Sequence, residues 1–97
     1  MMVPEPDWDE ILDEIEERYG SGIVGLRVEE REIRFENRDD ESAFRLFQTR
    51  ATREGEFWRI EERLDEQVVR VAMARDWRTA LDRYDRAVES GETGFGS

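Results

Sequence analysis

The chain contains no cysteine, no histidine and no lysine, and each absence excludes a kind of chemistry. Without cysteine there are no disulfides, no thiolate nucleophile and no zinc site of the cysteine type. Without histidine the commonest general base and metal ligand is missing, and with it the Ser-His-Asp triad. Without lysine there is no Schiff base and no phosphate-loop lysine. We therefore expect a protein that is not an enzyme and that uses no cofactor and no metal.

Long apolar runs are also missing. No run approaches the roughly 18 residues that a membrane-spanning helix needs. The first ten residues, MMVPEPDWDE, are acidic where a signal peptide would be basic. These features predict a cytoplasmic protein that does not enter a membrane. The 97 residues fit one small domain, which we place at residues 1–91, followed by a flexible tail at residues 92–97.

What the chain has in excess is negative charge, with 26 carboxylates against 15 basic residues and a net charge of −11. Every basic residue is arginine. This composition resembles that of proteins from salt-accumulating haloarchaea, in which carboxylates keep the protein hydrated while salt screens their repulsion. High-GC coding combined with one acidic helix is the alternative explanation. The acidity is concentrated in residues 1–19, which carry eight carboxylates and one arginine.

Hydrophobic periodicity predicts helices at residues 7–19, 38–55 and 75–91. Aspartates stand at the expected N-caps, and glycines follow the expected ends. Between the helices, alternating apolar residues predict one β-hairpin over residues 23–37 and a second around residues 58–73, with its turn near Asp65 and Glu66.

The two halves of the chain resemble each other. LRVEER (26–31) returns as WRIEER (58–63), and RDDESAFRLF (38–47) returns as RDWRTALDRY (75–84). We therefore predict an internal ββα duplication, with repeats at about 23–52 and 57–88. The predicted fold is of the α+β class, with the element order α-ββ-α-ββ-α. Its four-stranded antiparallel sheet is covered on one face by helices.

Strand alternation also predicts what the uncovered face of the sheet carries. If the apolar residues point inward, four arginines point outward: Arg27, Arg34, Arg59 and Arg70. Such a set is able to bind phosphate or carboxylate groups. The alternative is cross-strand pairing with the interleaved Glu29, Glu36 and Glu61 on a solvated surface. The aromatic residues are predicted to lie on the inward face, and the chain is acidic, so nucleic acid is not an expected partner.

The first helix is a second candidate surface. Its like-charged neighbours four residues apart are unfavourable at low salt. The acidic residues Asp9, Asp13, Glu16 and Glu17 form either a docking surface for a basic partner or the solvated face of a halophilic protein. We therefore expect a non-enzymatic protein–protein interaction or regulatory module, or a subunit of a larger assembly. Its expected partner is another protein or a second copy in a dimer. The alternatives are a ligand or nucleic-acid binder that uses the arginine face, and a carboxylate- or metal-dependent hydrolase.

Overall fold

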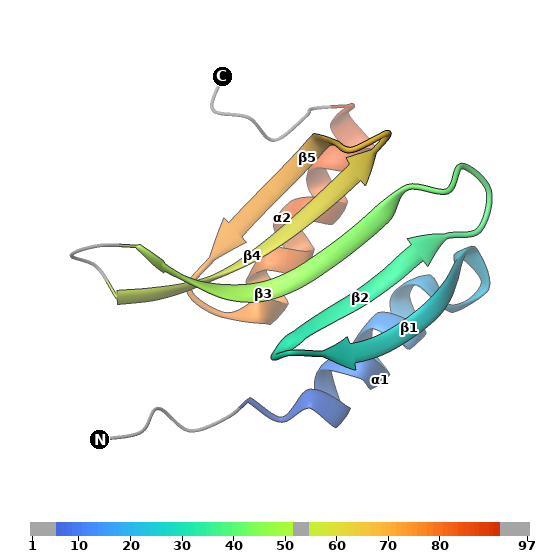
Figure 1. Ribbon diagram of the computed structural model, residues 1–97. Coiled ribbons are helices and arrows are strands. Elements are labelled where there is room, and N and C mark those ends of the chain that lie inside the picture. The colour runs from blue at the N-terminus through green and yellow to red at the C-terminus, as the bar shows by residue number, and fades with distance from the viewer. Residues whose placement is uncertain (1–5, 52–54, 92–97) are drawn as a thin grey trace.

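The computed structural model describes residues 6–51 and 55–91. Over these residues the chain forms one antiparallel sheet of five strands, in the order β1-β2-β3-β4-β5, and two α-helices (Figure 1). The elements are α1 (Trp8–Tyr19), the 3-10 turn η1 (Gly20–Gly22), β1 (Ile23–Glu29), β2 (Glu32–Asn37), β3 (Ala43–Ala51), β4 (Gly55–Leu64), β5 (Gln67–Ala74) and α2 (Trp77–Ser90). Both helices lie on the same face of the sheet, α1 behind β1 and β2 and α2 behind β4 and β5. The predicted α+β class is confirmed.

Two of the three predicted helices form where their capping residues place them. The Asp7 side chain accepts a hydrogen bond from the backbone N–H of Glu10 at the start of α1. The Asp76 side chain accepts one from the backbone N–H of Thr79, at 2.9 Å, at the start of α2. Gly91 ends α2 with a φ of 76°, in the left-handed region where glycine carries no steric penalty.

The cap of α2 gives a testable prediction. Asp76→Ala is expected to lower the free energy of unfolding by about 1 kcal/mol at pH 7. The hydrogen bonds from the backbone and side chain of Thr79 hold the pKa of Asp76 below its usual value. This stabilisation is therefore present above the unfolded pKa and is lost as the pH falls through the folded one. Urea unfolding at pH 7 and at about pH 2.5 measures the difference.

Asp76→Asn is the matched control, because asparagine keeps a capping oxygen but does not titrate. Its stability is expected to stay near that of the unsubstituted protein at pH 7. A loss as large as that of Asp76→Ala would show that the cap is not the source of the effect.

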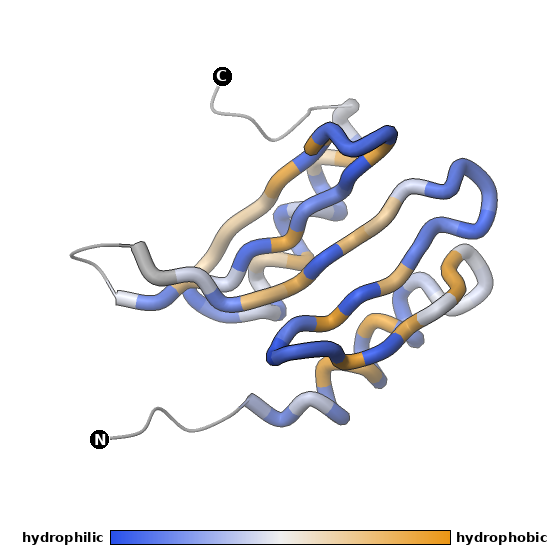
Figure 2. Tube along the Cα trace, in the orientation of Figure 1, coloured by the Kyte–Doolittle hydropathy of each residue, from blue (hydrophilic) through white to orange (hydrophobic). Residues whose placement is uncertain are grey.

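Two-residue turns close both predicted hairpins. Glu30 and Arg31 connect β1 to β2, and Asp65 and Glu66 connect β4 to β5; all four have a positive φ, as a type I′ turn requires. These turns and the β2–β3 loop are strongly hydrophilic (Figure 2). Both hairpins are confirmed.

The helix predicted at residues 38–55 is wrong, because residues 43–51 form β3, the central strand of the sheet. In the AFRLFQTRA segment Phe44 and Leu46 both face the helices, and their spacing of two residues is that of a strand. The spacing of three between Phe44 and Phe47 is that of a helix, so the segment fits both structures. The aspartates expected to cap the helix belong to the preceding loop instead. Asp40 accepts hydrogen bonds from the backbone N–H and the hydroxyl of Ser42.

This correction also changes the strand count and the repeat. The sheet has five strands rather than four, and two helices rather than three cover it within the described residues. Residues 38–47 form a loop and the start of β3, whereas the matching residues 75–84 lead into α2. The predicted ββα duplication is therefore not confirmed. The predicted tail at residues 92–97 lies outside the described residues.

A β-bulge in β5, opposite Glu62 and Arg63 of β4, reverses the faces of the rest of β5. Arg63 pairs with Val68, but Glu62 pairs with Arg70, which leaves Val69 as an extra residue. One extra residue moves every later side chain of a strand to the opposite face. Val71 and Met73, expected to face inward, therefore lie on the face away from the helices.

The hydrophobic core lies between the sheet and the two helices. Its largest fully buried apolar side chains come from both helices and from the three middle strands: Ile11, Ile15, Ile33, Leu46, Ile60 and Leu81. Tyr19 and Phe35 stack at 6.1 Å, Phe35 and Phe44 stack at 4.7 Å, and Tyr84 meets Phe44 edge to face at 5.8 Å. This aromatic row spans the space between the two helices.

Candidate functional site

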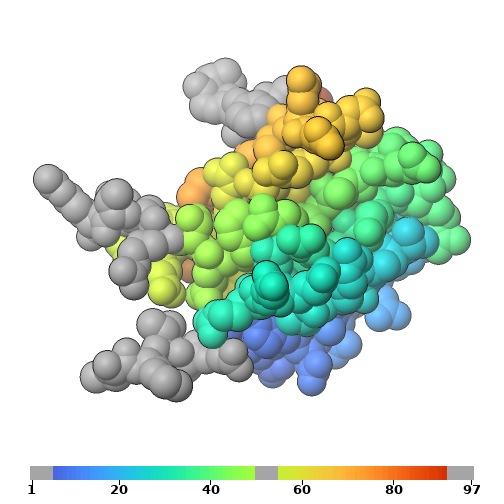
Figure 3. All heavy atoms as spheres, in the orientation of Figure 1, coloured from blue at the N-terminus to red at the C-terminus, as the bar shows by residue number. Residues whose placement is uncertain are grey.

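The face of the sheet turned away from the helices is not covered by any described helix, and Figure 3 views the molecule from this side. We call it the outer face. The strand register places five arginines and four glutamates on it: Arg27, Arg34, Arg45, Arg59, Arg63, Glu29, Glu32, Glu36 and Glu61. The outer face thus carries slightly more positive than negative charge, although the whole chain has a net charge of −11.

Three of the four arginines predicted for this surface lie on it, namely Arg27, Arg34 and Arg59. The fourth, Arg70, does not, because the bulge in β5 turns it toward the helices. There it forms an ion pair with Glu62, and its guanidinium lies 5.8 Å from the centre of the Tyr84 ring. The prediction of an outward Arg70 is therefore wrong.

Arg45 and Arg63 also lie on the outer face but are not among the predicted site residues. Arg45 was not predicted on the outer face because its segment was predicted to be a helix. Strand alternation was therefore not applied to it. A signal is nevertheless present, since Arg45 lies between the inward-facing Phe44 and Leu46. A signal for Arg63 is present too, because Arg59, Glu61 and Arg63 alternate regularly along β4 and share one face.

Buried carboxylates hold four of the five outer-face arginines in place, all except Arg27. Glu32 is only 8% exposed, although no helix covers it, because arginine side chains lie over it. Nε and Nη2 of Arg45 donate to its two oxygens at 2.8 and 2.9 Å, and Nε of Arg34 donates as well. The hydrogen bonds from Arg45, and then those from Arg34, hold the pKa of Glu32 below its usual value despite its burial.

Glu61 has the same role on β4. It is 5% exposed and contacts three arginines: Arg45 at 3.4 Å, Arg59 at 2.8 Å and Arg63 at 3.5 Å. Because Arg45 contacts both glutamates, the two carboxylates and four arginines form one continuous network across β2, β3 and β4. The arginines outnumber the buried carboxylates, so the network as a whole is positive.

Four of the outer-face arginines surround a hollow of about 390 Å³ over β1 to β4. Arg27, Arg34, Arg45 and Arg63 line it, together with the small side chain of Ala43 and with Glu36. In the described part of the chain, Arg34 and Arg63 hydrogen-bond to carboxylates through Nε. Their terminal guanidinium nitrogens are left to bind an acceptor that enters the hollow. Two such nitrogens in one plane match the two oxygens of a carboxylate.

An apolar patch adjoins the arginine network. It consists of Phe47, Phe57, Val71 and Met73, which share the outer face with Arg59 and Glu61. The guanidinium of Arg45 lies 4.6 Å from the centre of the Phe47 ring, and that of Arg75 lies 5.3 Å from the centre of the Phe57 ring. The prediction that all aromatic residues face inward is therefore wrong for these two phenylalanines.

The four acidic residues predicted on the first helix all lie on its exposed side: Asp9, Asp13, Glu16 and Glu17. None of them forms an ion pair with another described residue. By contrast, Arg78 of α2 binds Glu10 and Glu14 at 2.9 Å each. The helix therefore has one face tied to α2 and one acidic face open to solvent.

The described residues contain no group of three or more acidic side chains placed to hold a metal ion. No described helix is long and apolar enough to cross a membrane. No protein-family model, curated protein or solved structure matches this chain significantly.

Proposed function

We propose that the protein is a non-enzymatic interaction module of the cytoplasm whose outer face binds an acidic segment of a partner protein that also carries apolar residues. The observation that supports this most directly is the hollow lined by Arg27, Arg34, Arg45 and Arg63. Arg34, Arg45 and Arg63 are already held by the buried Glu32 and Glu61, so little side-chain entropy is lost when they bind a carboxylate.

Charge supports an acidic partner. The chain has a net charge of −11, and α1 alone carries six carboxylates against one arginine. Most of the molecular surface therefore repels an acidic segment, whereas the outer face attracts it. Such a contrast orients an approaching partner and selects one docking surface.

The apolar patch supports a protein partner rather than a nucleic acid. Phe47, Phe57, Val71 and Met73 offer adjacent area that apolar side chains of the partner are able to cover. A nucleic acid would also meet the repulsion of the whole chain, because its affinity depends on neutralising many phosphates. The outer face thus combines charge-assisted binding of a carboxylate with burial of apolar surface.

The test uses a labelled synthetic peptide that alternates glutamate with leucine or phenylalanine, and it measures binding by fluorescence anisotropy. Arg34→Gln combined with Arg63→Gln is expected to weaken binding about tenfold or more, because their terminal nitrogens make the contact. Arg45 is kept, since it supports both buried glutamates.

Arg38→Gln combined with Arg86→Gln is the matched control. It changes the net charge by the same amount at two exposed positions outside the outer face. This control is expected to bind the peptide like the unsubstituted protein. Equal weakening by both double variants would show a general charge effect and would overturn the site.

Two further results would favour the other predicted partners. Tighter binding of a uridine oligonucleotide than of the peptide would favour the nucleic-acid alternative. A molecular mass that doubles with concentration in the unsubstituted protein and in the Arg34 and Arg63 double variant alike would point to a dimer formed through another surface. Retained peptide binding in the double variant would overturn the arginine-lined hollow as the binding site.

A further inference from the structure

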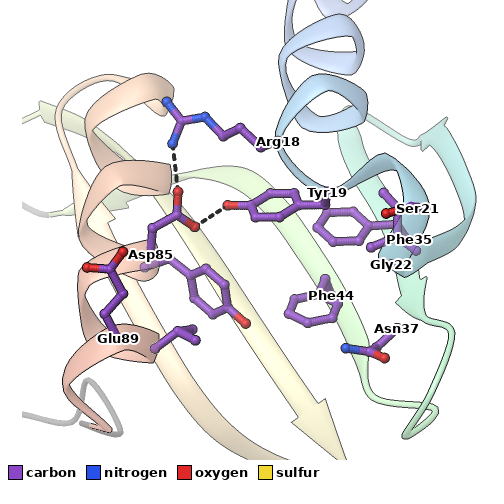
Figure 4. Close-up of a pocket in the computed structure, with 12 residues that line it drawn as sticks. Arg18, Tyr19, Ser21, Gly22, Phe35, Asn37, Phe44, Asp85 and Glu89 are labelled. Atoms are coloured by element: carbon purple, nitrogen blue, oxygen red, sulfur yellow. Dashed lines mark hydrogen bonds and ion pairs between the residues drawn. The ribbon is translucent and has the colours of Figure 1, made fainter.

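A second hollow lies on the opposite side of the molecule, between α1 and α2 (Figure 4). We call it the helix cleft. Its volume is about 580 Å³, within the range of small-molecule sites. Tyr19, Phe35, Phe44 and Tyr84 contribute an aromatic wall, while Asp85 and Glu89 of α2 lie at its polar rim.

The charge of the cleft is negative. Arg18 is the one cation among its described lining residues, and all three of its nitrogens are engaged. Nε binds Glu14, Nη1 binds Asp85 and Nη2 binds Asp82, at 2.7 to 2.9 Å. Burial alone would lower the pKa of Arg18, but these three carboxylates raise it overall, so it stays charged and paired.

The second rim carboxylate is free. Glu89 forms no ion pair within the described part of the chain and is exposed to solvent. Asn37, the last residue of β2, offers a further polar group on the other side of the cleft. Its Oδ1 accepts hydrogen bonds from the backbone N–H of Asp39 and Asp40, so its Nδ2 is left for the cleft.

The tyrosine rings of the aromatic wall favour binding of a cation. Burial raises the pKa of Tyr19, and the hydrogen bond that its hydroxyl donates to Asp85 at 2.5 Å raises it further. Burial and the nearby Glu62 raise the pKa of Tyr84 in the same way. A tyrosine ring is neutral near pH 7 even without these shifts, and the face of a neutral ring attracts a positive charge through its quadrupole.

We propose that the helix cleft binds a small organic cation, an ammonium group attached to one aromatic ring or a similarly flat apolar body. The ring packs against the aromatic wall, and the ammonium group lies toward Asp85 and Glu89. This site is separate from the outer face and does not depend on the function proposed for it.

The test follows backbone amide shifts of the labelled protein by NMR during titration with phenethylammonium. Two matched probes keep the ring but change the charge, namely the neutral phenethyl alcohol and the anionic phenylacetate. We expect saturable shifts at Ser21, Gly22 and Val88 with the cation, about three- to tenfold weaker binding of the alcohol, and no binding of phenylacetate.

Val88→Trp is designed to fill the cleft, since Val88 lines it and is 46% exposed. It is expected to remove the shifts. Gly22→Leu is the second filling variant, because a Cβ at Gly22 would meet no atom within 4 Å. Leu64→Trp is the control, at an exposed apolar position outside the cleft lining.

Glu89→Gln separates charge from shape. It is expected to weaken binding of the cation about threefold and to leave binding of the alcohol unchanged. Phenylacetate bound as tightly as phenethylammonium would overturn the proposal. So would unchanged binding of the cation in both filling variants, or the absence of any saturable shift.

Discussion

Arg70→Ala is expected to lower the free energy of unfolding by about 3–5 kcal/mol, because it leaves a buried carboxylate without its cation. The carboxylate is Glu62, which is 8% exposed and lies on the helix-facing side of the sheet. Arg70 and the hydroxyl of Tyr84 both donate to its Oε1, the latter at 2.9 Å. Phe44, its pairing neighbour on β3, has no polar side-chain group to replace the lost cation.

The expected loss is a large part of the roughly 5–15 kcal/mol that a domain of this kind has in total. It corresponds to a fall in melting temperature of about 15 °C or more. Circular dichroism melts and urea unfolding both measure it.

Arg59→Ala is the matched control on the outer face. It removes an arginine from Glu61, which keeps Arg45 and Arg63 as partners. We expect it to cost less than about 1 kcal/mol. A second variant, Arg70→Ala with Glu62→Gln, removes the buried charge and is expected to regain part of the loss. Equal costs for Arg70→Ala and Arg59→Ala would contradict the importance of the buried pair.

The local features of the fold were predictable from the sequence. Capping aspartates mark the starts of α1 and α2, and two-residue turns follow from the strand alternation on either side of them. These signals act within a few residues. Arg27, Arg34 and Arg59 were predictable on the outer face for the same reason, because each lies in a strand segment with a regular period of two.

The central strand was not predictable in the same way. Phe44 and Phe47 are three residues apart, as in a helix, while Phe44 and Leu46 are two apart, as in a strand. Pairing with the neighbouring strands, β2 on one side and β4 on the other, decides between them, and these contacts lie outside the periodicity of the segment itself. Tertiary pairing therefore overrides the local pattern.

Two β-bulges explain the remaining differences between the predicted and the observed faces of the strands. Val69 in β5 is one extra residue, and it moves Arg70 to the helix-facing side of the sheet and Val71 onto the outer face. A similar irregularity in β1 lies at Gly25, which has a φ of 70°, and Val24 before it is 44% exposed. A single inserted residue carries no compositional signal of its own, yet it changes which side chains form the candidate site.

The second large expected effect is that of salt on the melting temperature. The melting temperature is expected to rise by about 10 °C between 0.05 and 1 M KCl, because the screening length falls from more than 10 Å to about 3 Å. The exposed acidic face of α1 contributes strongly, since Asp13 lies four residues from both Asp9 and Glu17. Salt also weakens the ion pairs between the helices, such as that of Arg18 with Asp85, and this lowers stability. These two groups are in direct contact and partly buried, so salt screens this pair less.

Neutralising this face tests the origin of the effect. Asp13→Asn with Glu16→Gln and Glu17→Gln is expected to raise the melting temperature by about 4 °C in 0.05 M KCl and to leave it nearly unchanged in 1 M KCl. Asp9→Asn is the control, because it relieves one repulsive pair but also removes a favourable negative charge from the helix N-terminus. A melting temperature of the unsubstituted protein that stays flat or falls with KCl would rule out salt adaptation as the explanation of its composition. It would leave the acidic face of α1 as a candidate docking surface for a basic partner.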